Sequence, residues 1–592
     1  MRDAVLIIDL SNYSYEIEHR PNLFEEWIGG VGVAVQLLKE QMNPKADPLT
    51  EENVIVFATG PFTPAYPLAS KTVALFKSPL TGNLGESHAG GRTATSIANA
   101  GYGAIVIKGK SRKPVYLVIE NGKVHFKDGR ALWSIPDSLV VGRILAENEP
   151  GRGIRTVMRI GGAGEKLVRY ACVTTETYRH FGRLGLGAVF GSKRLKAIIV
   201  RGRKKYVPAD GKKFREVYDE IFKKAIESDA MKKYHLLGTA ANILPLNELN
   251  SLPTRNLQSA RFENAEEISG EALAEHNLGR RIACSHCPIA CIHLATLRIP
   301  YENEPYFYKT IMISYDYELI YSLCSMVGVG SRDGLLRLIH KVESYGLDAI
   351  STGVCLAWAT EALEKGILSE KDTIIKLSFG DIKGYLKAID YLYEQPNDFY
   401  RHLAMGVEHA SDVYGGKVFA LAFGGNEMPG YHTGYAAHLG YATGLRHSHL
   451  DSAGYSIDQK EKSLTPKELI DKLIAEECWR QVLSSLVVCF FARKVYTSDV
   501  ISKAFEPLGV EISEDELKKK GEEIYKEKLR LKVKMGFNPE NLRFPKRIFE
   551  TESLQGKLDE KFIEEAKKYY VRSVNEVIGL GSSPHYTLIT SE

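Results

Sequence analysis

The chain has 592 residues, of which 44% are hydrophobic, 25% charged and 10% aromatic, and its formal net charge is +4. This composition excludes the collagen-like, disordered and coiled-coil classes, and so small an excess of positive charge argues against a nucleic-acid-binding protein. A chain of this length typically folds into about three or four domains and needs no disulfide staples.

The N-terminal third is predicted to be rich in strands. Six short β-branched or aromatic runs are separated by glycine, proline and Asn-Gly turn signals: residues 4–8, 54–58, 72–76, 104–107, 115–119 and 197–200. The first run is too short for a signal peptide and is interrupted by Asp9. No apolar stretch approaches the roughly 20 residues of a membrane span. We therefore expect a cytoplasmic protein that begins with a β or α+β layer.

Helical patterns dominate after Pro208. Asp210 is predicted to cap a helix whose apolar residues between 214 and 225 share one face. The capping boxes Thr465–Glu468 and Ser513–Glu516 predict two further helix starts. Together these signals predict an α+β fold with a β-rich domain over 1–207 and two mainly helical domains over 208–405 and 406–592.

Three cysteines form the most specific local motif, Cys284-x-x-Cys287-x-x-x-Cys291. Closely spaced thiols of this kind can bind one face of a [4Fe–4S] cluster, with a fourth thiol supplied from elsewhere. There are two alternatives: a zinc site that includes His286 or His293, and a set of inert buried thiols that bind no metal. The candidates for a fourth ligand are Cys172, Cys324, Cys355, Cys478 and Cys489.

Glycine-rich loops form a second group of signals. Residues 179–193 alternate glycines with cations, and shorter loops of this type occur at 88–92 and 29–32. Glycine lets a backbone approach a phosphate-bearing ligand closely, and arginine matches the geometry of phosphate oxygens. Tight turns explain each loop equally well, but three such loops in one domain predict a large polar or polyanionic ligand.

The segment Glu343-Ser-Tyr-Gly346-Leu347-Asp348 places two carboxylates around a Gly-Leu turn. Helices commonly end with such a glycine, which is the simplest interpretation. The functional alternative is a helix end that presents hydrogen-bond acceptors to a polar ring system.

These segments together resemble the tungsten-containing aldehyde ferredoxin oxidoreductase family. The resemblance implies a tungsten bis-pyranopterin cofactor, with a [4Fe–4S] cluster beside one pterin and an N-terminal β domain as the base for both pterins. Molybdenum uses the same pterin ligands. The collinear matches are residues 77–82, 88–91, 103–109, 113–116, 162–165, 179–197, 284–291, 318, 346–353, 440–443 and 489.

The resemblance also implies roles for single residues. Cys489 joins the three clustered cysteines as the fourth cluster ligand. The first pterin motif corresponds to Glu343, Leu347 and Asp348. The second motif departs from the family pattern, because Ser484 replaces its usual Asp and Val487 its Gly. One pterin is therefore expected to be held more by backbone and by Val488, with Leu450 also counted among the pterin-binding residues.

The pterin phosphates and the active site complete these expectations. Lys71 and Arg179 match the cations that meet the phosphates, close to the Gly90 loop. His88 and His180 match positions whose backbone carbonyls reach a Mg²⁺ that bridges the phosphates. Glu318 matches the active-site carboxylate, and His449, with His447 as second choice, matches the active-site histidine.

The resulting hypothesis is the oxidation of an aldehyde to a carboxylic acid, with electrons passing through the cluster to ferredoxin. Arg337 stands where homodimeric members have a metal-binding Glu. We therefore expect an oligomer in which the chain binds a small ferredoxin-like iron–sulfur subunit, in place of a metal-bridged pairing with a second copy of itself. The alternatives are reduction of an aromatic acyl-CoA or acid on the same cofactor, and a non-catalytic iron–sulfur or zinc scaffold.

Overall fold

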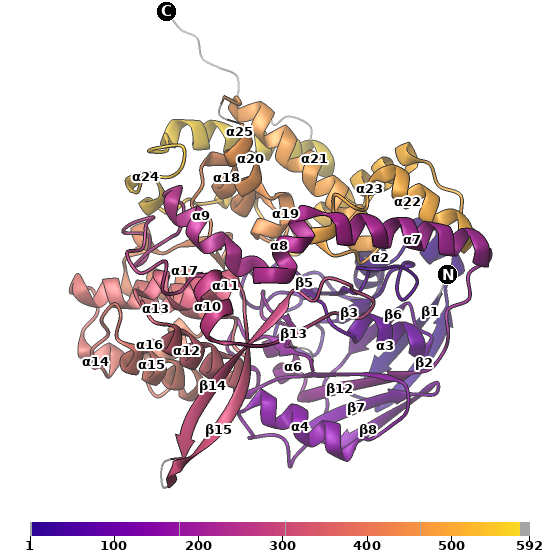
Figure 1. Cartoon of the computed structure of the whole chain (residues 1–592), viewed down its shortest axis with the longest axis horizontal. Helices are drawn as coiled ribbons and strands as arrows, with labels where there is room; N and C mark the ends of the chain where they lie inside the picture. The colour runs from indigo at the N-terminus through magenta and orange to yellow at the C-terminus, as the bar shows by residue number, and fades with distance from the viewer. Residues whose placement is uncertain (1–2, 177, 302–303, 462, 580–592) are drawn as a thin grey trace, which may run out of the picture.

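The computed structural model describes residues 3–176, 178–301, 304–461 and 463–579. Its N-terminal part contains two six-stranded sheets (Figure 1). The first has the order β2-β1-β6-β3-β4-β5, in which β1 and β6 are parallel and the other neighbours antiparallel. Its strands are β1 Ala4–Asp9, β2 Ser14–His19, β3 Ile55–Ala58, β4 Thr72–Lys77, β5 Leu84–Ala89 and β6 Ala104–Lys108.

The second sheet has the order β11-β10-β9-β12-β7-β8. A two-residue turn joins β7 to β8 through Asn121 and Gly122, whose φ values of 51° and 74° are those of the hairpin turn that Asn-Gly favours. All six runs predicted from the sequence lie in or overlap strands. The strands are β7 Val115–Glu120, β8 Lys123–Asp128, β9 Ile154–Arg159, β10 Val173–Thr174, β11 His180–Phe181 and β12 Leu195–Gly202.

One apolar core joins the two sheets. The ring of Phe57 in β3 lies 5.4 Å from that of Phe181 in β11, and Ile105 and Ile198 belong to the same buried cluster. The other face of the first sheet is covered by α2 (Gly30–Gln41) and by α23 (Glu514–Lys534). The N-terminal part is therefore a layered base that is buried on both faces of its first sheet.

The three helix starts predicted from capping signals are confirmed. Asp210 accepts hydrogen bonds from the Lys212 and Lys213 amides at the start of α7 (Gly211–Glu227). Both capping boxes are formed, at the starts of α21 (Pro466–Ser485) and α23. These motifs are local, so each marks the start of its helix through residues within a few positions of one another.

One element of the second predicted domain differs from the expected helical texture. Strands β13 (Leu278–Ile282), β14 (Ile292–Tyr301) and β15 (Glu304–Tyr315) form an antiparallel sheet whose long β14–β15 hairpin projects from the molecule (Figure 1). Residues 306–315 are rich in aromatic and β-branched side chains, which favour strands. Residues 208–405 are therefore a mixed region and not a purely helical one.

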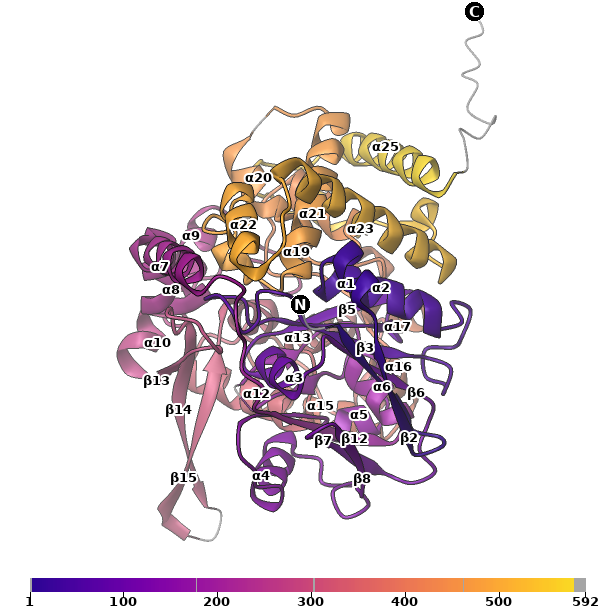
Figure 2. The ribbon, with the colours of Figure 1, turned by 90° about the vertical axis from the view of Figure 1, so that its right-hand side faces the viewer.

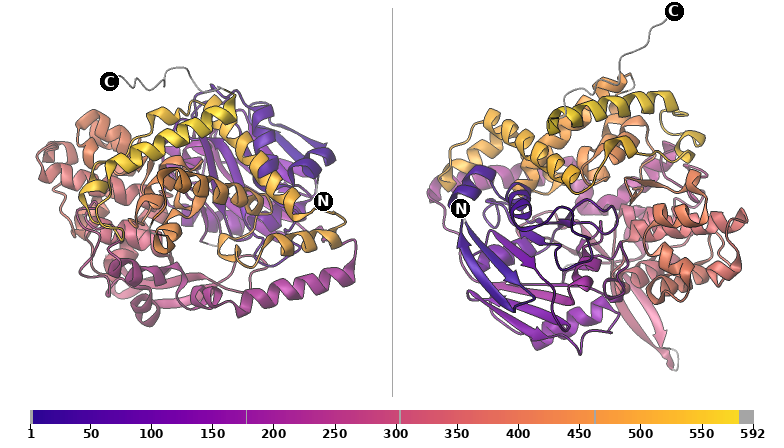
Figure 3. Two further views of the ribbon diagram at one scale, coloured as in Figure 1. Left: turned by 90° about the horizontal axis from the view of Figure 1, so that it is seen from above. Right: turned by 180° about the vertical axis from the view of Figure 1, so that it is seen from behind.

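The remaining helices pack beside and above the sheets (Figures 2 and 3). In the rear view the sheets lie below the orange and yellow C-terminal helices and next to the salmon ones. Within the described residues, no helix is both long and apolar enough to cross a bilayer. The helices that matter for the site are α8 Asp229–Leu237, α11 Tyr317–Leu323, α12 Arg332–Tyr345, α13 Ala349–Glu364, α18 Tyr435–Thr443, α19 His449–Ser452 and α25 Glu560–Ile578.

Candidate functional site

The backbone of Leu68 connects two cysteine segments that are far apart in the sequence. Its N–H donates to the carbonyl of His286 (3.1 Å), and its carbonyl accepts from the N–H of Cys489 (2.9 Å). The Ser285 N–H donates to the Gly91 carbonyl (2.9 Å), so the 88–92 loop also contacts the cysteine motif. Cys489 is thereby held beside the Cys284–Cys291 motif.

The other cysteines lie elsewhere. Cys172, Cys324 and Cys355 are buried, and the Cys172 thiol lies 3.7 Å from the Leu347 carbonyl. Cys478 lines a cavity between α21, α23 and α25. The four cysteines predicted as cluster ligands are all partly exposed. Within the described residues, no three His, Cys, Asp or Glu side chains are arranged to hold a metal ion.

Two cations flank these thiols. A Cβ added to Gly90 would lie 3.0 Å from the Cys284 sulfur, 3.6 Å from the Lys71 Nζ and 3.8 Å from the Arg179 Cγ. Burial raises the pKa of the Cys291 thiol to about 11 and raises the pKa of Cys287 as well. Near neutral pH these two thiols therefore become thiolates only where a cation, such as bound iron, stabilises them.

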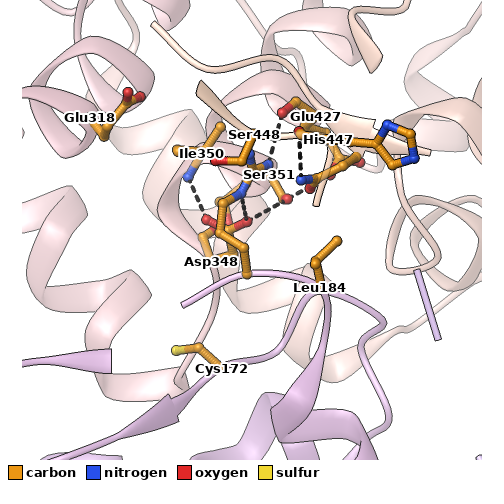
Figure 4. A network of polar contacts seen from close by, with 12 residues as sticks. Cys172, Leu184, Glu318, Asp348, Ile350, Ser351, Glu427, His447 and Ser448 are labelled. Carbon is orange, nitrogen blue, oxygen red and sulfur yellow. Dashed lines mark hydrogen bonds and ion pairs between the residues drawn. The ribbon is translucent and has the colours of Figure 1, made fainter. Parts of the chain in front are cut away.

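Asp348 is the centre of a buried polar network between the base and the helices (Figure 4). Helix α12 ends at Gly346, whose φ of 70° makes it the glycine cap predicted from the sequence, and Asp348 then caps α13. One carboxylate oxygen of Asp348 accepts from Arg183 Nε (2.9 Å) and from Ser351 Oγ (2.7 Å). The other oxygen accepts from the Ile350 N–H (3.0 Å).

The network continues to Glu427, a residue that the sequence analysis did not identify. Ser351 Oγ lies 2.6 Å from Glu427 Oε2, and a single hydroxyl proton cannot serve both Asp348 and Glu427. Burial raises the pKa of Glu427 above its usual value, so this carboxyl binds a proton more readily than an exposed glutamate does. Its neighbours Gly424 and Gly425 were the only hint in the sequence of a close backbone approach here.

Arg183 lies within the glycine-rich 179–193 loop but was not predicted as a site residue. Its Nε donates to Asp348 and its Nη2 to the Glu427 carbonyl (2.8 Å). Its Nη1 is buried and has no hydrogen-bond partner among the described residues. Because an unpaired buried guanidinium N–H is costly, this atom indicates a place for an acceptor group of a ligand.

Glu318 and His449 meet beside this network. Glu318 lies in the first turn of α11; its Oε2 accepts from the Gly430 N–H (3.1 Å), and its Oε1 lies 3.5 Å from His449 Nε2. Burial raises the pKa of Glu318 to about 8, and burial, with the Arg183 charge, lowers that of His449 to about 3. Near pH 7 the carboxyl is therefore mostly protonated and the imidazole neutral, with Nδ1 of His449 free of partners among the described residues.

His447 occupies a different place. Its Nδ1 lies 3.1 Å from the Tyr441 carbonyl, and its ring packs against Gly424 and Phe537. Figure 4 shows its side chain pointing away from Glu318, on the opposite side of the Asp348 network. Of the two histidines predicted from the sequence, the structure brings only His449 to Glu318.

Of the residues predicted in the first pterin motif, Glu343 lines a cavity of about 410 Å³, whereas Leu347 and Asp348 do not. His180 Nε2 lies 3.2 Å from Glu343 Oε1, and both residues line this cavity together with Arg159 and Tyr178. Leu347 is buried, and the Cys172 N–H donates to the Gly346 carbonyl (2.8 Å). The first pterin motif is thus tied directly to the β-rich base.

The residues predicted at the second pterin surround the end of α21. A Cβ on Gly30 would lie 2.2 Å from the Ser484 carbonyl, so the 29–32 loop touches this segment directly. The Val488 N–H donates to the Leu483 carbonyl (2.9 Å), and Val487 takes a φ of 54°, which explains why glycine would fit there. The Leu450 carbonyl accepts from Arg480 Nη1 (2.6 Å).

His88 belongs to a further buried network of polar side chains that the sequence did not indicate. Its Nε2 lies 2.7 Å from Glu86 Oε1, and Lys528 lies 2.5 Å from the other oxygen of Glu86. Burial lowers the pKa of His88 to about 4, so its ring is neutral near pH 7. Glu86 belongs to a strand and Lys528 to a distant helix, and no local pattern connects them.

Comparison with known proteins gives two family matches. The model of the aldehyde ferredoxin oxidoreductase N-terminal domain matches residues 5–202, and the model of domains 2 and 3 matches residues 216–574. The tungsten-containing aldehyde ferredoxin oxidoreductase of Thermococcus kodakarensis is 31% identical over 586 residues, with 93% of this chain and 92% of the relative covered.

One further relative and one solved structure carry different functional descriptions. The aliphatic sulfonate oxidoreductase, WOR-like subunit, of Pyrococcus furiosus is 29% identical over 66% of this chain and 64% of that protein. A solved structure, the active site complex BamBC of benzoyl coenzyme A reductase with 1,5-dienoyl-CoA, superposes with a TM-score of 0.79. It covers 98% of this chain and 97% of that chain at 22% identity, which is a likeness of fold.

Proposed function

Because the chain belongs to the aldehyde ferredoxin oxidoreductase family, we propose that it oxidises an aldehyde to a carboxylic acid. One aldehyde and one water give one carboxylic acid, two protons and two electrons, and the electrons leave singly to ferredoxin or a ferredoxin-like subunit. The observation that carries the proposal is the Glu318–His449 pair, which offers uncharged, partly unsatisfied polar atoms beside the Asp348 network.

The residues present fit the cofactors of the family. The four cysteines lie close to one another and to the cations Lys71 and Arg179. The Arg183 Nη1 atom has no acceptor among the described residues, and Gly90 leaves a space that a Cβ at this position would occupy. When bound, tungsten supplies Lewis-acid activation and accepts two electrons, and a [4Fe–4S] cluster relays them singly. The cysteines would hold the cluster.

The pterins and their phosphates would be held by the remaining predicted residues. Lys71 and Arg179 would meet the phosphates, and the carbonyls of His88 and His180 would reach Mg²⁺. The pterin rings would be bound by Glu343, Leu347, Asp348, Leu450, Ser484 and Val488.

The side chains of the pair then take distinct roles. Neutral His449 donates a hydrogen bond to the carbonyl oxygen of the aldehyde and polarises it. Glu318, once ionised, accepts a proton as water adds or as the bond to hydrogen breaks. Positioned acid–base groups of this kind contribute about 10²–10⁴-fold each to a rate.

Metal and pterin analysis of anaerobically purified protein, followed by a viologen-linked aldehyde assay, tests the proposal. We expect tungsten, pterin and iron to copurify and simple aldehydes to be oxidised. Iron or zinc without tungsten and pterin, from tungsten-supplied cells, would favour the scaffold alternative. Tungsten-replete protein that reduces an aromatic acyl-CoA and ignores aldehydes would assign the chain to the other reaction class.

A further inference from the structure

Two arginines of this protein are partly buried and yet have no partner. Among the described residues, Arg169 and Arg179 are the arginines that are not exposed and whose side chains make no hydrogen bond or ion pair. Arg179 lies beside the cysteines and is predicted to meet a pterin phosphate. A guanidinium that leaves water without gaining an acceptor is costly, so Arg169 also indicates a place for an anion.

Arg169 is held where the β-rich base meets the helices. Its N–H donates to the Ala404 carbonyl (2.8 Å), which fixes the backbone of this residue against the second predicted domain. Burial lowers the pKa of Arg169 from its usual value, and the charge of Asp47 offsets only part of this effect. Asp47 is exposed and forms no ion pair with Arg169. The guanidinium, which stays charged in proteins, is therefore partly desolvated and unpaired.

Arg169 lines a cavity of about 320 Å³, which is within the size range of small-molecule sites. Remote parts of the chain form its walls: the turn between β4 and β5, the helix α17 (Val407–Tyr414) and residues 536–542 after α23. A further wall is the turn at Gly424 and Gly425, whose φ values are 57° and 86°. Because this wall carries no side chain, a ligand can approach its backbone closely.

Neutral hydrogen-bond donors line the cavity together with Arg169. His409 Nε2 lies 2.9 Å from His402 Nδ1, whereas His409 Nδ1 makes no hydrogen bond within the described residues. The Oδ1 atom of Asn538 accepts from the amide of residue 540 (2.9 Å), so its amino group is left to donate elsewhere. The side chain of Asn541 makes no hydrogen bond to the described part of the chain. These groups can donate to the oxygens of an anion.

The two carboxylates of the cavity, Glu408 and Asp412, already have cationic partners. Arg543 Nη2 lies 2.9 Å from Glu408 Oε1, and Lys417 pairs with Asp412. Neither carboxylate forms an ion pair with Arg169, whose charge therefore stays uncompensated. Their own negative charge opposes a ligand that carries two or more negative charges. The cavity therefore favours a monoanion.

A second cation lies behind the cavity wall. Lys532 is fully buried, and its Nζ donates to Oδ1 of Asn83, which lines the cavity (2.7 Å). Burial lowers the pKa of Lys532 to about 7, and no carboxylate of the described residues pairs with its ammonium group. A nearby anion raises the pKa of a lysine, so a bound anion would favour the charged form of Lys532. This lysine therefore adds to the attraction for an anion.

The cavity is separate from the candidate active site but adjoins its polar network. Gly406 lines the cavity, and a Cβ on this residue would lie 3.0 Å from Glu427 Oε1. The amide of Val407 donates to the same oxygen (2.9 Å). The lining residues include none of those predicted to hold the cofactors or to act on the substrate. A ligand in this cavity would therefore not occupy the place of the substrate.

We propose that this cavity, here called the Arg169 cavity, is a binding site for a small carboxylate. The two oxygens of the ligand would accept paired hydrogen bonds from the guanidinium, whose planar fork matches a carboxylate, and further ones from His409 and Asn541. The carboxylates of Glu408 and Asp412 would select this monoanion over a phosphate dianion. Binding here does not depend on the proposed reaction, because no residue of the cavity takes part in it.

The test is a binding measurement that does not require turnover. The anaerobically purified full chain is titrated calorimetrically with sodium benzoate and with sodium acetate, in a chloride buffer of constant ionic strength. Arg169→Gln should weaken binding by about tenfold or more, because it removes the charge and the paired donors. Arg169→Lys should recover part of the affinity, since it keeps the charge but not the fork. A thermal melt without ligand checks that each variant is folded.

The matched control is Arg112→Gln, which makes the same change in net charge. Arg112 is exposed, lies between β6 and β7 and does not line the Arg169 cavity. This variant should change carboxylate binding by less than about twofold, because salt screens an exposed charge outside the cavity. Glu318→Gln is a second control, which alters the candidate active site and should leave binding at the Arg169 cavity equally unchanged.

The possible outcomes either support this site or overturn it. Benzoate or acetate binding that is lost in Arg169→Gln and kept in both controls would support it, even in a protein that oxidises no aldehyde. No carboxylate binding by the wild type, or an equal loss in Arg169→Gln and Arg112→Gln, would overturn it. Binding that is lost in Glu318→Gln and kept in Arg169→Gln would place the carboxylate at the candidate active site instead. Inorganic phosphate that binds more tightly than either carboxylate, in an Arg169-dependent way, would overturn the choice of ligand.

Discussion

The Nε2 atom of His449 lies 3.5 Å from Oε1 of Glu318, and burial acts on the two groups in opposite directions. It raises the pKa of the carboxyl to about 8 and lowers that of the imidazole to about 3. Near neutral pH the contact is therefore a pair of uncharged groups and not a salt bridge. A pair of this kind can exchange a proton with a substrate without first breaking a strong ionic contact.

Replacing Glu318 with glutamine should lower aldehyde turnover by about tenfold or more while leaving the metal content unchanged. Glutamine keeps the size of the side chain and can still accept from the Gly430 amide, but it cannot take up a proton. The exposed Glu271→Gln variant serves as the control. Full activity in a tungsten-replete Glu318→Gln protein would exclude Glu318 as the base.

The aldehyde kcat/KM should rise with pH to a plateau, with an apparent pKa near 8. Glu318 accepts a proton only when ionised, and its pKa of about 8 leaves it mostly protonated below that pH. His449, with a pKa of about 3, stays neutral and adds no further step above pH 5. A pH–rate profile that is flat from pH 6 to 9 would contradict this assignment.

The same shift predicts how stability depends on pH. The pKa of Glu318 is higher in the folded protein than its unfolded value of about 4.3. The stability that the protonated Glu318 carboxyl contributes to the fold is therefore fully present below about pH 4.3. The contribution is lost as the pH rises through about 8. The Glu318→Gln protein should therefore lose less stability than the wild type between pH 5 and 8.5, as compared by thermal unfolding.

Cys489→Ala should reduce the iron bound per chain and weaken the EPR signal of the reduced protein. The Leu68 backbone holds Cys489 beside the clustered cysteines, and a cubane that lacks one thiol ligand is more easily lost. Cys478→Ala is the matched control, since Cys478 is also partly exposed but lines a separate cavity. If both variants keep all their iron, the fourth ligand is another residue.

Gly30→Ala should destabilise the protein by about 2 kcal/mol or more. The new Cβ would lie 2.2 Å from the Ser484 carbonyl, and the φ of Gly30 is +39°, so both overlap and backbone strain oppose alanine. Gly211→Ala is the control, because its Cβ would meet nothing within 4 Å in the first turn of α7. Melting temperatures measure both, and an equal change in the two would show that the 29–32 loop can move away from Ser484.

Asp348→Ala should cost about 3–5 kcal/mol, because it leaves the Arg183 guanidinium buried without its carboxylate. Asp381 also caps a helix, α15 (Ile382–Glu394), but within the described part of the chain it accepts from the Lys383 amide alone and makes no buried ion pair. Asp381→Ala should therefore cost about 1 kcal/mol. Equal losses in thermal unfolding would mean that Asp348 acts only as a cap.

The local structure was largely predictable. The six strand runs, the Asn121-Gly122 turn and the helix starts at Asp210, Thr465 and Ser513 all depend on residues within a few positions of one another. The β14–β15 hairpin was not predicted, although residues 306–315 are rich in the aromatic and β-branched side chains that favour strands. That error concerned interpretation and not missing information.

The sequence by itself determined which residue types the site has available, namely three clustered cysteines, several glycine loops and a few carboxylates and histidines. Only the tertiary structure decided that Cys489 lies beside the three, that His449 and not His447 reaches Glu318, and that Glu427 and Arg183 complete the Asp348 network. The physical reason is the range of the interactions. Capping and strand alternation act between neighbours in the chain, whereas these proximities arise where remote segments pack together, and no short pattern encodes such a meeting.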